Sequence, residues 1–326
     1  MKRRVIIDCD PGIDDSMAIM LSLRSEEIEL AGITLTAGNC PLESCFSNVK
    51  KVLHHMGCPD IPVCLGADRP LKVPFVNAKP VHGCDGLGGS DLPEVPGAPD
   101  IRTALDFLKE ELGKGGCSVI ALGPMTNLAQ LIMESPESFD AIEELVSMGG
   151  SFKSHGNISP VAEFNYWCDP DAAALVYDHL AKSGGHITMI GLDVTRRIVL
   201  TPSLLSLMER LNPREGAFIR KITGSYFDFH WKSERLIGCI VNDPLAVAYF
   251  LDHGMCRGIE AYTAVARDGI CRGQCVVDEK AYYHRQANAA VMTDTDAARF
   301  FRLFFRRVLG ASEADLDLID RCLMAE

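Results

Sequence analysis

The sequence has little positive charge and nothing that resembles a basic stripe. Its 326 residues include 32 lysines and arginines against 44 aspartates and glutamates, so the formal net charge is -12. A protein that binds nucleic acid needs a basic surface to neutralise the phosphates. The sequence therefore argues against a nucleic-acid partner, although it is compatible with a neutral piece of one.

Long apolar runs are also missing. No stretch approaches the roughly 20 residues that a membrane-spanning helix needs. The apolar stretch that follows Met1, Lys2, Arg3 and Arg4 is too short for a signal peptide. We therefore expect no membrane partner and a cytoplasmic location.

Closely paired cysteines are absent, although the chain has 13 cysteines. Their number is odd, they are scattered, and no two of them form a CxxC motif. A zinc site or a disulfide framework normally shows regular spacing. The better interpretation is a set of reduced thiols, which again fits the cytoplasm.

Apolar β-rich runs alternate with helical patterns, which is typical of a parallel sheet covered on both faces. Strands are expected at 4–8, 30–36, 61–65, 118–122, 144–148 and 187–190, and helices at 14–24, 43–56, 101–112, 125–133 and 171–181. After about residue 195 the pattern is helical, then β-like near 259–266 and 274–277, and a final helix is expected at 296–308. The predicted fold class is a single large α/β domain over residues 1–326, with a mostly parallel central sheet flanked by helices.

Two long segments interrupt this alternation, at 66–100 and 149–170. Both leave the carboxyl ends of expected strands. Ligands of open α/β sheets bind at these ends, and long loops there usually carry function. We expect both segments to contribute to a binding site.

Four aspartates lie within eight residues at the end of the first expected strand: Asp8, Asp10, Asp14 and Asp15. Asp14 and Asp15 fall in the first turn of the next helix, where they also complement the helix dipole. Such crowded carboxylates repel one another unless a cation or hydrogen-bond donors compensate the charge. The cluster indicates a hard metal ion and hydrolytic chemistry.

The cluster resembles the N-terminal signature D-[TC]-D-P-G-x-D-D of the inosine-uridine-preferring nucleoside hydrolases. Further motifs of that family follow in the same order: Ala37-Gly38-Asn39, His82-Gly83, Gly123-Pro124-Met125-Thr126-Asn127, Met148-Gly149-Gly150, Asn157, Ala162-Glu163-Phe164-Asn165, Asp169-Pro170-Asp171-Ala172-Ala173 and Asp243. The resemblance covers nearly the whole chain. It implies the Rossmann-like nucleoside hydrolase fold, the hydrolysis of ribonucleosides to ribose and free base in nucleoside salvage, and one calcium ion.

The resemblance also implies a set of calcium ligands, namely Asp10, Asp15, Asp243 and the backbone carbonyl of Thr126. Carboxylate and carbonyl oxygens are the ligands that calcium prefers, at a coordination number that leaves places for water and ribose hydroxyls. Thr126 also opens an expected helix, so its hydroxyl is a candidate helix cap. Asp10 is the predicted general base for a water molecule activated by the metal.

The ribose is expected to be held by polar side chains of the family motifs, namely Asp14, Asn39, Asn157, Glu163 and Asn165. These groups would select ribose over deoxyribose and orient the sugar. Met148 is expected beside the sugar and His82 beside the bound nucleoside. The alternative is that Asn39 and Asn165 are ordinary loop residues and that Met148 belongs to the core.

The chain departs from the family at Asn242, where many members have a histidine before the last aspartate. That histidine is implicated in protonating the leaving base. Asn242 is expected at the same catalytic position, where an asparagine can hydrogen-bond the base but has no proton to give at neutral pH. We predict His230 as the substitute acid, with Glu234 as the second choice. Tyr226 and Trp231 are predicted to stack on the base, although aromatic residues on such a helix also serve as core or subunit contacts.

Because of this departure the sequence does not define the preferred base. Inosine, uridine, cytidine and modified purine nucleosides such as queuosine all fit the sequence. Two other functions are compatible with the aspartate cluster. A haloacid-dehalogenase-like phosphatase also has Asp-x-Asp after its first strand, but here Gly12 takes the place of its usual threonine or valine. A catalytically silent calcium-binding protein of the same fold is the other. By resemblance, the expected assembly is a homodimer or homotetramer.

Overall fold

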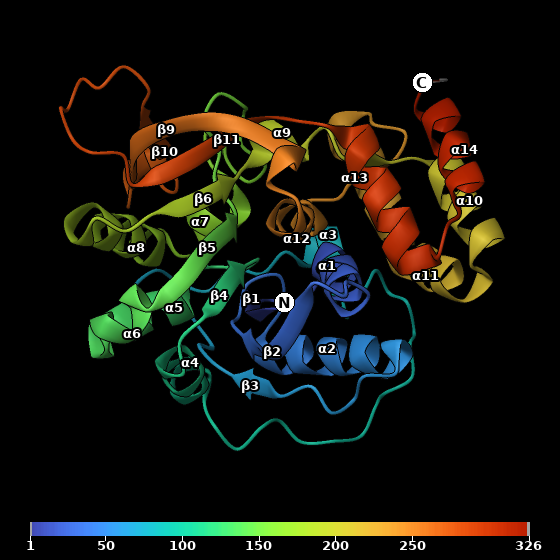
Figure 1. Ribbon diagram of the computed structural model, residues 1–326, viewed down its shortest axis with the longest axis horizontal. Coiled ribbons are helices and arrows are strands. Elements are labelled where there is room, and N and C mark those ends of the chain that lie inside the picture. The colour runs from blue at the N-terminus through green and yellow to red at the C-terminus, as the bar shows by residue number, and fades with distance from the viewer. Residues whose placement is uncertain (1, 325–326) are drawn as a thin grey trace.

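A nine-stranded sheet runs through the centre of the molecule, for which the computed structural model describes residues 2–324 (Figure 1). Its strands are β1 (Arg3–Cys9), β2 (Ile28–Leu35), β3 (Val63–Leu65), β4 (Cys117–Ala121), β5 (Ile142–Met148), β6 (Ile187–Ile190), β9 (Cys256–Val265), β10 (Cys275–Asp278) and β11 (Ala289–Thr295). They are ordered β10-β9-β11-β6-β5-β4-β1-β2-β3. The short strands β7 (Val199–Leu200) and β8 (Cys239–Ile240) pair separately.

The strands from β11 to β3 in this order are all parallel, and β9 runs antiparallel to both of its neighbours, β11 and the edge strand β10. The predicted fold class, a single α/β domain with a mostly parallel sheet, is therefore confirmed. In such a sheet the carboxyl ends of β1, β2, β4, β5 and β6 lie on the same side.

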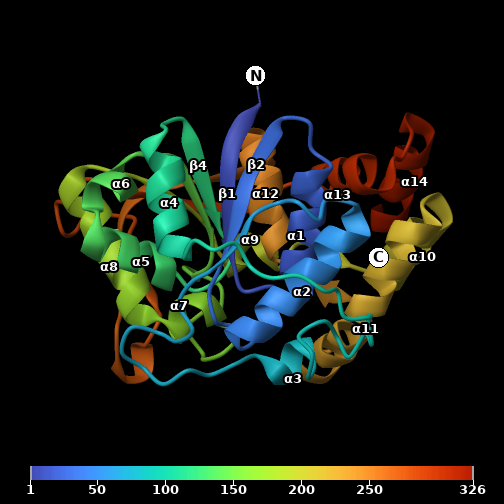
Figure 2. The same ribbon diagram turned by 90° about the horizontal axis from the view of Figure 1, so that it is seen from below.

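Helices cover both faces of the sheet. Their bounds are α1 (Ile13–Leu23), α2 (Leu42–Met56), α3 (Lys79–His82), α4 (Ala104–Gly113), α5 (Thr126–Glu134), α6 (Pro136–Asp140), α7 (Phe164–Cys168), α8 (Pro170–Ser183), α9 (Leu192–Thr195), α10 (Pro202–Leu211), α11 (Pro213–Glu234), α12 (Asp243–Leu251), α13 (Ala297–Phe304) and α14 (Glu313–Met324). Figure 2 shows α4, α5 and α8 on one side of the sheet and α1, α2 and α12 on the other.

The side chains of β1 show why both faces are covered. Val5 and Ile7 belong to the hydrophobic core under α1 and α2, whereas Ile6 belongs to the core under α4 and α5. Successive residues of a strand point to opposite faces, and all three of these side chains are fully buried. The strand is therefore apolar from Val5 to Ile7, directly before Asp8.

Most predicted elements are present with ends shifted by a few residues, but the prediction that the helix near 296–308 closes the chain is wrong. Helix α13 continues as a π-helical turn (Phe305–Leu309) that ends at Gly310, which has a φ of +71°. Helix α14 follows and buries Leu316 and Ile319, three residues apart, against the core. A glycine in the left-handed conformation ends one helix and lets the next begin.

The structure also describes the cysteines and the apolar character of the helices. All 13 cysteines are free thiols. Within residues 2–324, none of the helices combines the length and the apolar character that crossing a bilayer demands.

Candidate active site

A cavity of about 400 Å³ opens at the carboxyl ends of the parallel strands. Its walls include Asn39 after β2, Leu122 after β4, Met148 at the end of β5 and Leu192 after β6. The two long segments that interrupt the αβ alternation both contribute, the first through residues 76–82 and the second through residues such as Asn157 and Glu163. The position agrees with the general rule for open α/β sheets.

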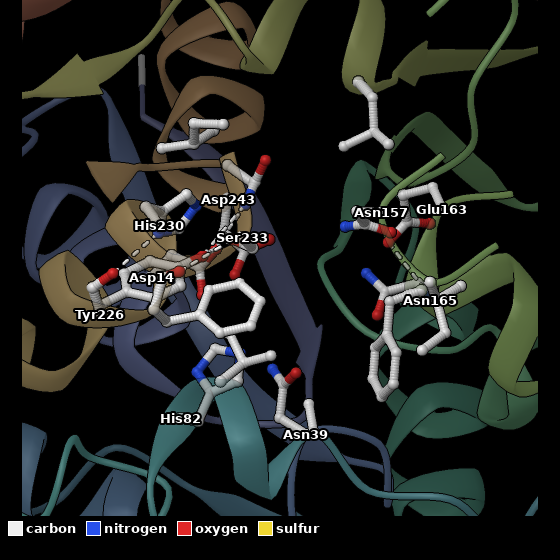
Figure 3. A pocket seen from close by; sticks show the side chains of 18 of the residues that line it. Asp14, Asn39, His82, Asn157, Glu163, Asn165, Tyr226, His230, Ser233 and Asp243 are labelled. Carbon is white, nitrogen blue, oxygen red and sulfur yellow. Dashed lines mark hydrogen bonds between the residues drawn. The ribbon is translucent and has the colours of Figure 1, made fainter. Parts of the chain in front are cut away.

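The labelled side chains gather on different sides of this cavity (Figure 3). Asp14, Tyr226, His230 and Asp243 lie together on one side, Asn157, Glu163 and Asn165 lie on the opposite side, and His82 and Asn39 lie below.

Three buried carboxylates lie close together, two of which, Asp14 and Asp243, line the cavity. Asp14 and Asp15 stand in the first turn of α1, as the sequence predicts, and Asp243 is the first residue of α12. One oxygen of each lies within 4.8 Å of the others, so the three are able to hold a metal ion. The predicted ligand set contained Asp10 where this group has Asp14.

Asp10 lies one residue beyond the end of β1 and is fully buried. Its Oδ2 accepts a hydrogen bond of 2.6 Å from the backbone N–H of Asn39. Oδ2 of Asp15 accepts from the backbone of Gly12 at 2.9 Å and from Nδ2 of Asn39 at 3.1 Å. Within residues 2–324, the Oδ1 atoms of Asp10 and Asp15 have no hydrogen-bond partner.

Burial and mutual repulsion disfavour the charged forms of these groups. Burial and the charge of Asp15 raise the pKa of Asp10 well above its ordinary value, and burial and the charge of Asp14 raise that of Asp15 to about 7. The pKa of Asp243 is also raised well above its ordinary value, first by burial and then by Asp14. A hard cation would reverse this repulsion and satisfy the free oxygens. The residues therefore fit a metal ion bound through oxygen.

Glycines make room for the Asp10 carboxylate. A Cβ at Gly123 would lie 2.6 Å from Oδ1 of Asp10, and a Cβ at Gly38 would overlap Oδ2. Because real side chains do not approach this closely, both positions require glycine for a reason of space. These two glycines belong to motifs that the sequence already singled out.

Asp8 is fully buried and is held by side chains of two other elements. Its Oδ1 accepts hydrogen bonds from the Thr34 hydroxyl at 2.5 Å and from Nδ2 of Asn127 at 2.7 Å.

The Thr126 hydroxyl donates to Asp169 at 2.8 Å, and the residue before α5 makes no side-chain cap. The hydroxyl of Thr126 is therefore not a helix cap, and the metal contact of its carbonyl stays a prediction.

The opposite wall presents polar groups with fixed orientations. Nδ2 of Asn165 donates to the carbonyl of Leu122 at 2.7 Å and to that of Met148 at 3.2 Å. This leaves its Oδ1 for a ligand, since the amide nitrogen is already committed. Glu163 caps α7 and accepts from the backbone N–H of Asn165 at 2.7 Å. Burial raises the pKa of Glu163 to about 7.

His82 lies between α1 and α11 and is buried. Its Nδ1 accepts a hydrogen bond of 3.2 Å from the backbone N–H of Ile13, and its ring lies 5.6 Å from that of Tyr226. Burial lowers the pKa of His82. An Nδ1 that accepts has no proton, so the neutral ring has its proton on Nε2 and presents a donor there.

Asn242 and His230 face the cavity from the other side. Nδ2 of Asn242 donates to Oδ2 of Asp14 at 3.0 Å and is 3.4 Å from the Tyr226 hydroxyl. The carbonyl of Tyr226 accepts a hydrogen bond of 2.9 Å from Nδ1 of His230. Burial lowers the pKa of His230.

Trp231 does not line the cavity, which corrects the prediction that it stacks on the base. Its side chain is 49% exposed and lies against Arg235. The neighbouring residues Phe229 and His230 are the ones that face inward. Because each residue of a helix is rotated by about 100° from the one before, a change of one position decides between the cavity and solvent.

The sequence did not single out several residues of the apolar wall, among them Val76, Val81, Ile158, Phe229 and Ile240. It also missed Arg196, which pairs with Glu234 at 2.7 Å and donates to the carbonyl of Gly156. Arg196 follows α9, close behind the carboxyl end of β6. Its position near the end of a parallel strand is the one sequence signal that could have identified Arg196 as a site residue.

The sequence model of the inosine-uridine preferring nucleoside hydrolase family matches residues 5–302. The pyrimidine-specific ribonucleoside hydrolase RihA of Salmonella typhi is 34% identical over 309 residues, which cover 93% of this chain and 97% of that protein. The solved purine-preferring ribonucleoside hydrolase from Gardnerella vaginalis has a TM-score of 0.88 at 32% identity and covers 94% of this chain and 98% of its own. The plant nucleoside hydrolase PpNRh1 has a TM-score of 0.90 at 27% identity, with 95% and 100% covered.

Proposed function

Since the chain belongs to the inosine-uridine preferring nucleoside hydrolase family and is thus a ribonucleoside hydrolase, we propose that it cleaves the N-glycosidic bond with the help of one calcium ion. The products are ribose and the free base. The observation that carries the calcium proposal is the pair of buried carboxylate oxygens on Asp10 and Asp15 that have no partner in the described part of the chain.

Asp10, Asp15, Asp243 and the carbonyl of Thr126 would hold the ion. When bound, it supplies a Lewis acid that makes a neighbouring water molecule easier to deprotonate. The type of ligand supports calcium, because three carboxylates and a carbonyl are all hard oxygen ligands. The ligand set contains no thiolate or imidazole, which zinc prefers.

Asp10 acts as the general base that takes the proton of the attacking water. Its orientation is supported by the hydrogen bond from Asn39, which holds one oxygen and leaves the other free. Asp14, Asn39, Asn157, Glu163 and Asn165 hold the ribose hydroxyls and fix the sugar for attack. Buried carboxylates around the ring also stabilise the positive charge that develops on the sugar.

The departing base needs a hydrogen-bond donor. The predicted acid, His230, gives a proton only from its charged form, and burial lowers its pKa. Neutral His82, in contrast, has a proton on Nε2 because its Nδ1 accepts from Ile13. We therefore assign to His82 the hydrogen bond that stabilises the leaving base.

The base range of the proposal includes pyrimidines and purines, because the relatives are named for both. It also includes modified purine nucleosides such as queuosine, since the ion pair of Arg196 and Glu234 adds charged groups to the cavity wall. For the location we propose the cytoplasm, in keeping with the 13 free thiols. A homodimer or homotetramer is the proposed assembly, which sedimentation analysis of the purified protein would test.

The test of this function is a panel of natural and modified ribonucleosides, with the released base measured by chromatography and ribose by a reducing-sugar assay. We expect release of both products in equal amounts and much slower cleavage of 2′-deoxyribonucleosides. Release of phosphate from nucleotides without cleavage of nucleosides would instead indicate a phosphatase. No turnover of any substrate in the presence of calcium would indicate a silent binding protein.

A further inference from the structure

The cavity has a polar end and an apolar end. Carboxylates and amides surround the floor, whereas Val76, Val81, Ile158, Phe229 and Ile240 supply apolar surface elsewhere on the wall. A ribose with several hydroxyls suits the polar end, and a flat heterocyclic base suits the apolar end. His230, whose ring is in edge contact with Phe229 at 5.4 Å between centroids, belongs to the base end.

The hydrogen bond between His230 and Tyr226 fixes the tautomer of the imidazole. A backbone carbonyl only accepts, so Nδ1 of His230 must have the proton in that bond. In the neutral ring Nε2 then has a lone pair and no proton. Within residues 2–324 the ring makes its hydrogen bond through Nδ1, and Nε2 is not among the buried atoms that lack a partner.

The hydrogen-bond donors close to His230 are already committed within the protein. The hydroxyl of Tyr226 donates to Asp14, the amide of Asn242 donates to Asp14, and the hydroxyl of Ser233 donates to the carbonyl of Phe229. Two other atoms of the wall have no partner within the described part of the chain: Oδ1 of Asn242 and Nε of Arg196. Both of these atoms are buried under other protein atoms. His230 lines the cavity, and its Nε2 is not among the buried atoms without a partner.

We propose that His230 is a specificity-determining residue that accepts a hydrogen bond, through Nε2, from an N–H group of the base. The inference rests on the proposed nucleoside hydrolysis and defines its substrate class, namely nucleosides whose base presents an N–H donor away from the glycosidic bond. A base without that donor leaves a buried acceptor unpaired. Such a mismatch lowers kcat/KM by roughly 10- to 100-fold.

The experiment compares substrates that differ in one donor. The pairs are inosine with 1-methylinosine, uridine with 3-methyluridine, and adenosine with purine riboside, in the calcium-loaded enzyme. Nitrophenyl riboside serves as a substrate whose leaving group has no N–H. We expect the parent enzyme to prefer the donor-bearing member of at least one pair by roughly 10- to 100-fold in kcat/KM.

His230→Phe keeps a flat ring but removes the acceptor, and His230→Gln offers an amide oxygen in its place. The preference should fall to within a few-fold in the Phe variant and persist in part in the Gln variant. In both variants the cleavage of the donor-bearing nucleoside should fall more than the cleavage of nitrophenyl riboside. Trp231→Phe is the matched control, because it makes the same kind of change one residue away on an exposed side chain.

Three results would overturn the proposal. The first is a parent enzyme that cleaves the members of every pair equally well. The second is a Phe variant that keeps the full preference, which would assign the discrimination to another group. The third is an equal loss on all substrates, nitrophenyl riboside included, with an unchanged circular dichroism spectrum. Failure of the proposed function itself is distinct, since the parent enzyme would then cleave neither natural nucleosides nor nitrophenyl riboside.

Discussion

The backbone N–H of Asn39 donates a hydrogen bond of 2.6 Å to Oδ2 of Asp10 and leaves Oδ1 of the same carboxylate without a partner within residues 2–324. The bond joins the loop after β2 to the end of β1, two neighbouring strands of the sheet. It fixes the carboxylate in one orientation before any ligand arrives. Preorganisation of this kind is what a general base requires.

Replacing Asp10 by asparagine should remove the general base with little change in volume. We expect kcat for any nucleoside that the parent enzyme cleaves to fall by about 10²- to 10⁴-fold. In the presence of a chelator the variant should melt at a higher temperature than the parent, because one member of a repelling cluster has become neutral. Steady-state kinetics and calorimetry measure the two effects, and unchanged turnover would rule out Asp10 as the base.

Removal of calcium should abolish turnover and lower the melting temperature. Calcium added back should raise that temperature with the logarithm of its concentration, because the ion binds only the folded site. Asp243→Asn should lose this response, whereas Asp68→Asn, on the exposed surface, should keep it. A calcium response that persists in Asp243→Asn would contradict the proposed ligand set.

Gly123→Ala should disturb the site only through a steric clash. The added Cβ would lie 2.6 Å from Oδ1 of Asp10, so the carboxylate or the backbone must shift. We expect a loss of about 1–3 kcal/mol in unfolding free energy, as is usual for overpacking, and a fall in kcat of at least about tenfold. Gly113→Ala is the control, because its Cβ meets no atom within 4 Å. Equal behaviour of the two variants in urea denaturation would refute the steric explanation.

Glu163 should make the stability of the metal-free protein depend on pH. Burial raises its folded-state pKa to about 7 from 4.5, so the folded protein binds this proton more tightly than the unfolded chain does. The resulting stabilisation is complete below pH 4.5 and is lost as the pH rises through 7. Relative to the parent, Glu163→Gln should therefore gain up to about 3 kcal/mol between pH 5 and pH 8. Urea denaturation in chelator measures this difference, and parallel pH curves for the two proteins would contradict it.

The first aspartate cluster shows how far sequence reasoning reached. Asp8, Asp10, Asp14 and Asp15 are adjacent in the chain, so their common location follows from a strand that turns directly into a helix. The long loops were also identified correctly as cavity walls, because the carboxyl ends of parallel strands meet on one side of the sheet. These inferences needed only local pattern and one topological rule.

Helix α11 shows where sequence reasoning stopped. Tyr226, His230 and Trp231 all fit an aromatic wall by composition, yet only the first two line the cavity. The direction that each side chain takes depends on how the helix is rotated against its neighbours, and apolar residues on several sides of α11 do not define that rotation. Arg196 and Phe229 were missed for the same reason, because tertiary packing sets the direction of their side chains.

The sequence by itself determined the α/β class, the family motifs and the acidic centre, because these depend on periodicity and on residues close together in the chain. Tertiary structure decided which atoms remain free for a ligand. The lone pair on His230 follows from the carbonyl of Tyr226, and the proton on Nε2 of His82 follows from the N–H of Ile13 in a distant helix. Hydrogen bonds between segments far apart in the chain set these states, and no local pattern encodes them.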